Sequence, residues 1–170
     1  MKGKSYLQSA FQRAYKSKFH LFLLNLGISR FVPFNKPHRF KIIEISPNSV
    51  RIELPYIKRN LNHIKGIHAC ALATLNELAS GILIISRLDP SEFRIIMKSI
   101  HLDYVYQAKA KVYVSFKLSE AEIQELKDKA KISPVDFPVK LITFDQNNNE
   151  ICSSNIVWQL KSWEQVRTKS

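Results

Sequence analysis

The sequence predicts an α+β domain in which an antiparallel sheet of about six strands covers one long apolar helix. Segments with alternating apolar and polar residues occur in three pairs along the chain, and a stretch of about twenty mostly apolar residues from Ile67 follows the first pair. Strands joined mainly by hairpins form an antiparallel sheet, whose apolar face needs a cover. At 170 residues, with 45% hydrophobic and 24% charged residues, we expect a single domain over 1–170.

The N-terminal part predicts one helix over residues 5–26. Its apolar residues recur at mostly helical spacings, and Gly27 is a plausible stop. The two prolines of FVPFNKPH (31–38) predict an irregular connection. We therefore divide the chain into an N-terminal helix and connection (1–38) and a sheet-and-helix core (39–163). The basic helix can rest on a membrane or pack over the domain.

The core elements follow in order. Strands are expected over 39–46, 49–57, 93–107, 111–118, 138–144 and 151–160, and a Pro-Asn turn joins the first two. Ser119, with Glu122 three residues later, predicts a capping box at the start of a helix over 120–130. The tail from Lys161 is expected to be loose.

The charge distribution points to an anionic partner. The net charge is +12, and nine Lys or Arg residues precede the first acidic residue, Glu44. Nucleic acid, an acidic membrane surface, a polyphosphate ligand and a merely soluble basic surface all fit this excess. No nucleic-acid-reading motif occurs and the basic residues are dispersed, so we predict no nucleic-acid partner.

The cysteines and histidines indicate a reducing compartment and no metal site. Cys70 and Cys152 are the only cysteines and lack metal-like spacing, which favours a cytoplasmic protein. No signal peptide is expected at the N-terminus. The histidines away from the apolar helix show no ligand spacing, so we predict no bound metal; they are His20, His38, His63 and His101.

Glu77 is the only formally charged residue between Gly66 and Ser86. A charged residue at the centre of a bilayer costs about 3 kcal/mol, so a core helix explains this stretch better than a membrane span. Burying an ionised carboxylate in a protein core is also costly. Glu77 therefore lies at a helix edge in water, pairs with a lysine, or is kept for chemistry.

The residues around this helix carry a resemblance. Asn62, Gly66, the run Gly-Ile-His at 66–68 and the carboxylate nine residues after His68 resemble the signature of hotdog-fold acyl-CoA thioesterases of the phenylacetate type. That signature is Asn, a short gap, Gly, then His-Gly-Gly and an acidic residue on the helix. The resemblance covers nearly the whole chain. DYVYQAKAKV, LSEAEIQEL and VWQL resemble a thioesterase-like branch of unassigned activity.

The resemblance implies a hotdog fold and a homodimer, which can pair further into a tetramer, with active sites between protomers. The N–H of Ala69 would polarise the thioester carbonyl, and Glu77 of the other protomer would attack it or activate water. His68 would orient the carbonyl or cap the helix, and Asn62 would hold the loop or the carboxylate. Coenzyme A would enter as part of the substrate, with no separate cofactor.

Two features leave alternatives open. Lys58, Arg59 and Lys65 either attract the phosphates of coenzyme A or belong to a solvated loop. Ala69 and Cys70 replace the two glycines of the signature, and Cys70 is either a nucleophile beside His68 or a small residue packed in the helix.

The expected function is acyl-CoA hydrolysis. The alternative is a non-catalytic hotdog module that binds an acyl-CoA, a lipid or a protein partner.

Overall fold

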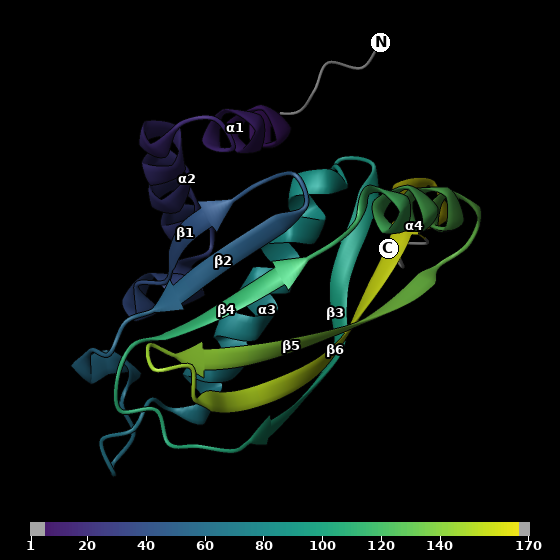
Figure 1. Ribbon diagram of the computed structural model, residues 1–170. Helices are drawn as coiled ribbons and strands as arrows, with labels where there is room; N and C mark the ends of the chain where they lie inside the picture. Colours follow the sequence, from purple (N-terminus) through teal and green to yellow (C-terminus); the bar gives the residue numbers. More distant parts are fainter. Residues whose placement is uncertain (1–5, 167–170) are drawn as a thin grey trace.

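Six antiparallel strands and one long helix make up the core of the computed structural model, which describes residues 6–166 (Figure 1). The chain runs through the following elements: α1 (Tyr6–Ala14), α2 (Lys18–Phe31), η1 (Pro33–His38), β1 (Lys41–Ile45), β2 (Ser49–Leu54), η2 (Lys58–Asn60), α3 (Ala69–Arg87), β3 (Phe93–Tyr104), β4 (Val112–Lys117), α4 (Glu120–Ile132), β5 (Val135–Asp145), β6 (Glu150–Ser162) and η3 (Trp163–Gln165).

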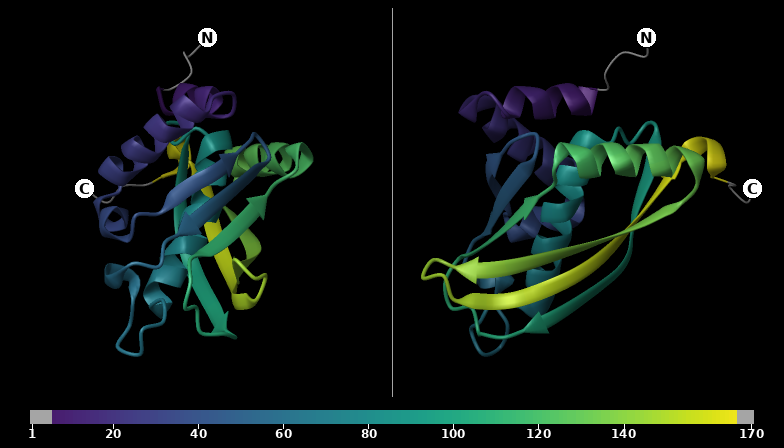
Figure 2. Two further views of the ribbon diagram at one scale, coloured as in Figure 1. Left: turned by 60° about the vertical axis from the view of Figure 1, so that its left-hand side comes forward. Right: turned by 45° about the vertical axis from the view of Figure 1, so that its right-hand side comes forward.

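The strands form one sheet in the order β1-β2-β4-β5-β6-β3, and every neighbouring pair is antiparallel. The sheet curves around α3, which packs mainly against β2 and β4, while α4 lies against β5 and β6 (Figure 2). The expected α+β class, the six strands and the long covered helix are confirmed. This is the arrangement of a hotdog fold, with β1 and β3 at the two edges of the sheet.

The length and apolarity of α3 would allow it to cross a membrane, but most of its side chains are buried inside this domain. Leu75, Ala79 and Leu83 are fully buried against the sheet. Gly81 allows the Trp158 ring of β6 to lie close to the helix, because a Cβ at Gly81 would come within 3.1 Å of that ring. The apolar stretch is therefore the core of the fold.

A buried polar network fixes how α3 is turned about its own axis. The Asn76 amide donates to Thr143 Oγ1 on β5 at 2.9 Å and accepts from Ser154 Oγ on β6 at 3.0 Å. One turn later, Trp158 Nε1 donates to Ser80 Oγ at 3.0 Å. Hydrogen bonds are directional, so these contacts hold one face of α3 toward β5 and β6. They thereby fix the direction in which Glu77, the residue after Asn76, leaves the helix.

The N-terminal helix predicted over 5–26 is instead two helices. Ser17 interrupts it by capping α2, since Ser17 Oγ accepts from the His20 N–H. Gly27 does not end the helix, which continues to Phe31 because Leu24 and Ile28 pack on the domain. The connection at 31–38, predicted to be irregular, mostly forms the 3₁₀ helix η1. The helix start predicted at Ser5 lies outside the described residues.

Asn25 of α2 closes one edge of the sheet. Its side-chain oxygen accepts from the Ile42 N–H at 2.8 Å, and its amide donates to the Ile42 carbonyl at 3.0 Å. The outer backbone groups of β1 are therefore partly satisfied by a helix. At the other edge, β3 is twelve residues long and has no strand beyond it within the described chain.

The C-terminal part is more ordered than the sequence predicts. The capping box at Ser119 is present, with Glu122 accepting from the Ser119 N–H at 2.8 Å. In the tail expected to be loose from Lys161, residues 161–165 instead continue β6 and form η3, while residues 167–170 lie outside the described residues. Trp163 holds it in place, because its Nε1 donates to the Pro90 carbonyl at 2.7 Å and its N–H to the Glu92 carbonyl.

Candidate functional site

The loop before α3 is shaped by Asn62. Its side-chain oxygen accepts from the N–H of Gly66 at 3.0 Å and of Ile64 at 3.1 Å, and its own N–H donates to the Gly66 carbonyl. Leu61 and Ile67 then form a short antiparallel bridge. Of the two roles that the sequence left open for Asn62, holding the loop is the one seen within this chain.

Asn60 places the start of α3, and sequence reasoning missed it. The Asn60 side chain is fully buried, and its amide donates to the backbone carbonyls of Pro55 and His38. The backbone carbonyl of Asn60 accepts from the His68 N–H at 2.7 Å. An asparagine in the basic run KRNLN gives no local sign of burial. The sequence offers one indication of this role: the amide of an asparagine can form hydrogen bonds with several backbone groups at once.

His68 caps α3. Its Nδ1 accepts from the Cys70 N–H at 3.1 Å, so in the neutral ring the proton lies on Nε2. The ring is exposed, and its Nε2–H takes no part in this cap. The capping role is confirmed, and it leaves one donor for a ligand.

The N–H of Ala69 is the free amide at this helix start. Ala69 is the first residue of α3, and within residues 6–166 its N–H has no acceptor, whereas the cap occupies that of Cys70. Tyr104, at the end of β3, donates its hydroxyl to the Ala69 carbonyl at 3.2 Å. An unpaired amide at the positive end of a helix is suited to a carbonyl oxygen that gains negative charge.

Glu77 is half-buried and unpaired. Within the described chain, its carboxylate has no hydrogen bond and no ion pair, so the predicted lysine partner is not found there. Burial raises the pKa of Glu77 above its ordinary value. This is the direction expected for a carboxylate in apolar surroundings.

The open side of α3 carries Glu77 together with small side chains. Cys70, Ala73 and Glu77 follow a helical i, i+3, i+7 spacing and are exposed or partly exposed, whereas Leu72 and Leu75 between them are buried. Cys70 is therefore a free, exposed thiol and is not packed into this core. Small side chains such as those of Cys70 and Ala73 allow a second helix to approach this stripe closely.

One chain cannot bring the Ala69 amide and the Glu77 carboxylate to the same carbonyl. The two residues lie eight positions apart on one helix, which is about 12 Å along its axis at 1.5 Å per residue. Both groups face outward. They can act together only if a second copy supplies one of them.

Basic and aromatic side chains surround the helix start. Lys58, Arg59 and Lys65 are exposed on the preceding loop, and no ion pair involves them within residues 6–166. Tyr104, the last residue of β3, is 51% exposed at the same helix start, where it contacts the Ala69 carbonyl. Sequence reasoning identified the cations and missed Tyr104, whose place beside α3 depends on where β3 ends.

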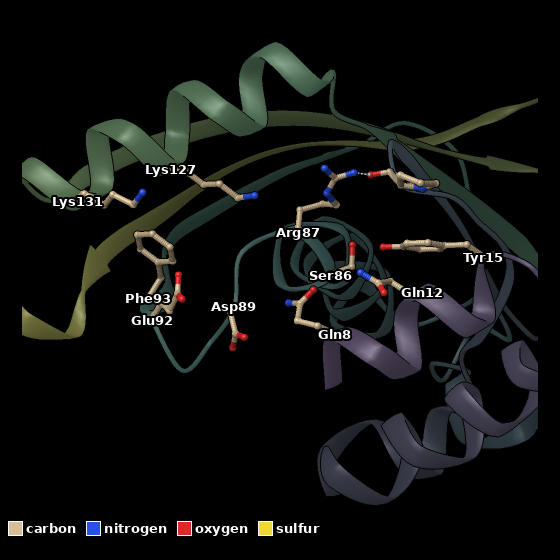
Figure 3. A pocket seen from close by; sticks show the side chains of 11 residues that line it. Gln8, Gln12, Tyr15, Ser86, Arg87, Asp89, Glu92, Phe93, Lys127 and Lys131 are labelled. Carbon is tan, nitrogen blue, oxygen red and sulfur yellow. Dashed lines mark hydrogen bonds between the residues drawn. The ribbon is translucent and has the colours of Figure 1, made fainter. Parts of the chain in front are cut away.

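A separate cavity of about 450 Å³ lies at the other end of α3, between α1, α4 and the start of β3 (Figure 3). Tyr15, Ser86, Arg87 and Lys127 line part of it. Arg87 is held by two hydrogen bonds to Glu120 and one to the Pro47 carbonyl. This cavity is a whole helix length from Ala69 and shares no residue with the site described above.

Comparisons with solved structures support the fold. A probable thioesterase of unknown function from Pseudomonas aeruginosa is 26% identical, with a TM-score of 0.77 over 83% of this chain and 95% of that chain. A thioesterase from Haemophilus influenzae is 12% identical, with a TM-score of 0.65 over 91% and 99%. A mutant thioesterase from Pseudomonas aeruginosa is 10% identical, with a TM-score of 0.66 over 88% and 99%. The last two similarities support the fold alone.

The family assignment rests on a broader match. No protein of curated function matches this sequence significantly. Residues 22–160, which include the whole of α3 and all of the sheet except the last two residues of β6, match the family described as a domain of unknown function, DUF4442. The chain therefore belongs to the DUF4442 family, a thioesterase-like branch of the hotdog fold whose function is unassigned.

Proposed function

We propose that this protein hydrolyses an acyl-CoA thioester at a site formed between two copies of the chain. The observation that carries the proposal is Glu77, a half-buried carboxylate without a partner on the open side of α3. Such a group lowers the stability of the folded chain. Its presence is therefore explained better by a chemical role than by packing. A raised pKa brings a carboxylate closer to the range in which a general base works best near neutral pH.

Two features support the pairing of copies. Among residues 6–166 no strand covers the β3 edge, whereas Asn25 of α2 caps part of the β1 edge. Pairing of two β3 edges would extend the sheet across both protomers. The small residues Cys70 and Ala73 would then allow the two α3 helices to lie close and antiparallel, which moves Glu77 of one copy toward Ala69 of the other.

In this arrangement the Ala69 N–H would bind the thioester oxygen, and the His68 Nε2–H is a second donor nearby. Glu77 of the partner copy would take a proton from water as the water oxygen attacks the carbonyl carbon. Negative charge would develop on the carbonyl oxygen, where the helix N-terminus stabilises it. The C–S bond would then break, and the proton would pass to the departing sulfur, giving a carboxylic acid and coenzyme A.

Lys58, Arg59 and Lys65 would attract the phosphates of coenzyme A. All three are exposed on the loop that Asn62 and Asn60 hold against the start of α3. Cations near a binding site raise the rate at which an anionic substrate arrives, and salt weakens that effect.

The second candidate is a non-catalytic module that binds the same ligand. It is favoured by Ala69 and Cys70, which carry a Cβ where the resembling thioesterases have glycines. A Cβ at Ala69 limits how closely a thioester can approach the backbone.

One experiment separates these functions. Release of free thiol is measured for acyl-CoAs of several chain lengths with the wild type, with Glu77→Gln and with Glu150→Gln, an exposed control. We expect turnover to fall by about 10²-fold to 10⁴-fold in Glu77→Gln and to stay unchanged in the control. Thermal stabilisation by acyl-CoA without turnover in the wild type would favour the binding module. Unchanged turnover in Glu77→Gln, or a monomer in solution scattering, would contradict the proposed site.

A further inference from the structure

The helix α2 is apolar on two opposite sides. Leu21, Leu24 and Ile28 pack on the core. The outer side carries large apolar side chains at i, i+3, i+4 and i+7 that stay exposed: Phe19 (65%), Phe22 (58%), Leu23 (44%) and Leu26 (52%). A helix on the surface of a soluble domain normally turns polar residues outward. The outer side of α2 is therefore an unusual surface.

Further large apolar side chains are exposed at the end of α2 and in the 3₁₀ helix η1 that follows. Phe31 is 86% exposed, Val32 41% and Phe34 67%. Large exposed apolar areas on a protein surface mark sites of interaction with proteins or membranes. We call the exposed apolar side chains of residues 19–34 the α2 patch.

The chain segment that carries the α2 patch has basic residues and no acidic ones. Residues 6–43 contain no Asp or Glu, and all of their cationic side chains are exposed: Arg13, Lys16, Lys18, Arg30, Lys36, Arg39 and Lys41. None of them takes part in an ion pair within the described residues. The partner of this surface must accept apolar side chains and supply negative charge.

From this combination we propose that α2 and η1 dock the protein on an anionic lipid surface. A helix lying in the plane of a bilayer interface places its apolar side at the boundary between head groups and acyl chains, and Lys and Arg contact the acidic head groups. Lys18 and Arg30, at the two ends of α2, fit the head-group level on either side of Phe22 and Leu26. The proposal does not depend on thioester hydrolysis.

A second copy of this chain is a poorer occupant. Two α2 patches facing each other would bring two basic segments together, and neither segment contains a carboxylate within residues 6–43 to offset the repulsion. The patch also lies beside β1, at the edge of the sheet opposite to β3 (Figure 1). Pairing through β3 would leave it uncovered.

The test is flotation of the full chain with vesicles. Vesicles of phosphatidylcholine with about 30% phosphatidylserine are compared with vesicles of phosphatidylcholine alone. We expect the wild type to bind the anionic vesicles at least about tenfold more strongly, and to be released by added salt. Phe22→Ser with Leu26→Ser, and Lys18→Glu with Arg30→Glu, should each weaken binding by at least about tenfold.

Matched controls carry similar changes elsewhere on the surface. Ile132→Ser removes an apolar side chain that is 83% exposed on α4, and Lys117→Glu reverses an exposed cation on β4. Both should bind as the wild type does. No binding to anionic vesicles, or equal loss in the controls, would overturn the proposal. The proposal would also be overturned if the wild type formed an oligomer in solution and the α2 variants formed a smaller species. A second copy of the chain would then cover the α2 patch.

Discussion

Replacing Asn76 with Ala removes the centre of the buried network that orients α3. The change deletes the hydrogen bonds to Thr143 Oγ1 (2.9 Å) and from Ser154 Oγ (3.0 Å), and all three residues are fully buried. Each lost hydrogen bond costs about 0.5–1.5 kcal/mol, and a buried hydroxyl left without its partner adds about 1–3 kcal/mol. Ser154 keeps a long contact to the Leu141 carbonyl, which limits the total. We expect a loss of about 2–4 kcal/mol in the free energy of unfolding.

The loss is measured by urea denaturation of both proteins at one concentration, because association would make the apparent stability concentration-dependent. For a chain of this length it corresponds to a decrease in Tm of about 5–15 °C. Asn155→Ala, on the exposed face of β6, is the control and should change stability by less than about 0.5 kcal/mol. If Asn76→Ala cost no more than this control, the network would not be what fixes the rotation of α3.

Two further predictions follow from the same contacts. The raised pKa of Glu77 means that the folded chain favours its protonated form, so wild-type stability falls as pH rises from the ordinary value of 4.5 through the raised pKa. Glu77→Gln lacks this titration and should melt higher than the wild type near pH 7 but not near pH 4; a difference independent of pH would contradict the assignment. Asn25→Ala removes both hydrogen bonds to Ile42 and should lower the free energy of unfolding by about 1–3 kcal/mol, and light scattering should detect association through the uncovered β1 edge. A variant that stays as stable and as monodisperse as the wild type would show that this edge is protected otherwise.

Local patterns in the sequence predicted most elements of the fold. Alternation of apolar and polar residues identified the strands, and the capping box at Ser119 marked the start of α4, because both depend on residues close together in the chain. The break at Ser17 and the continuation of α2 past Gly27 were missed. Ser17 competes with continued helix through its side chain, and Gly27 is tolerated because the packing of Leu24 and Ile28 outweighs the low helix propensity of glycine.

For the candidate site, the sequence located the loop and the helix start but not their supports. Glu77 was identified from the sequence, because it is a single charged residue within an otherwise apolar stretch. Asn60 and Tyr104 were not recognised, because their contacts to His68 and Ala69 join segments that are far apart along the chain. The catalytic roles of Ala69, His68 and Glu77 remain predictions.

The sequence by itself determined that this protein is an antiparallel sheet around one apolar helix, with an isolated carboxylate and a strongly basic N-terminal third, because periodicity and charge are properties of neighbouring residues. Only the tertiary structure decided which side of α3 stays open, which edge of the sheet is closed and which side of α2 is left in solvent. Those outcomes depend on directional contacts between distant segments, such as Asn76 with Ser154 and Asn25 with Ile42. A linear pattern does not contain such contacts.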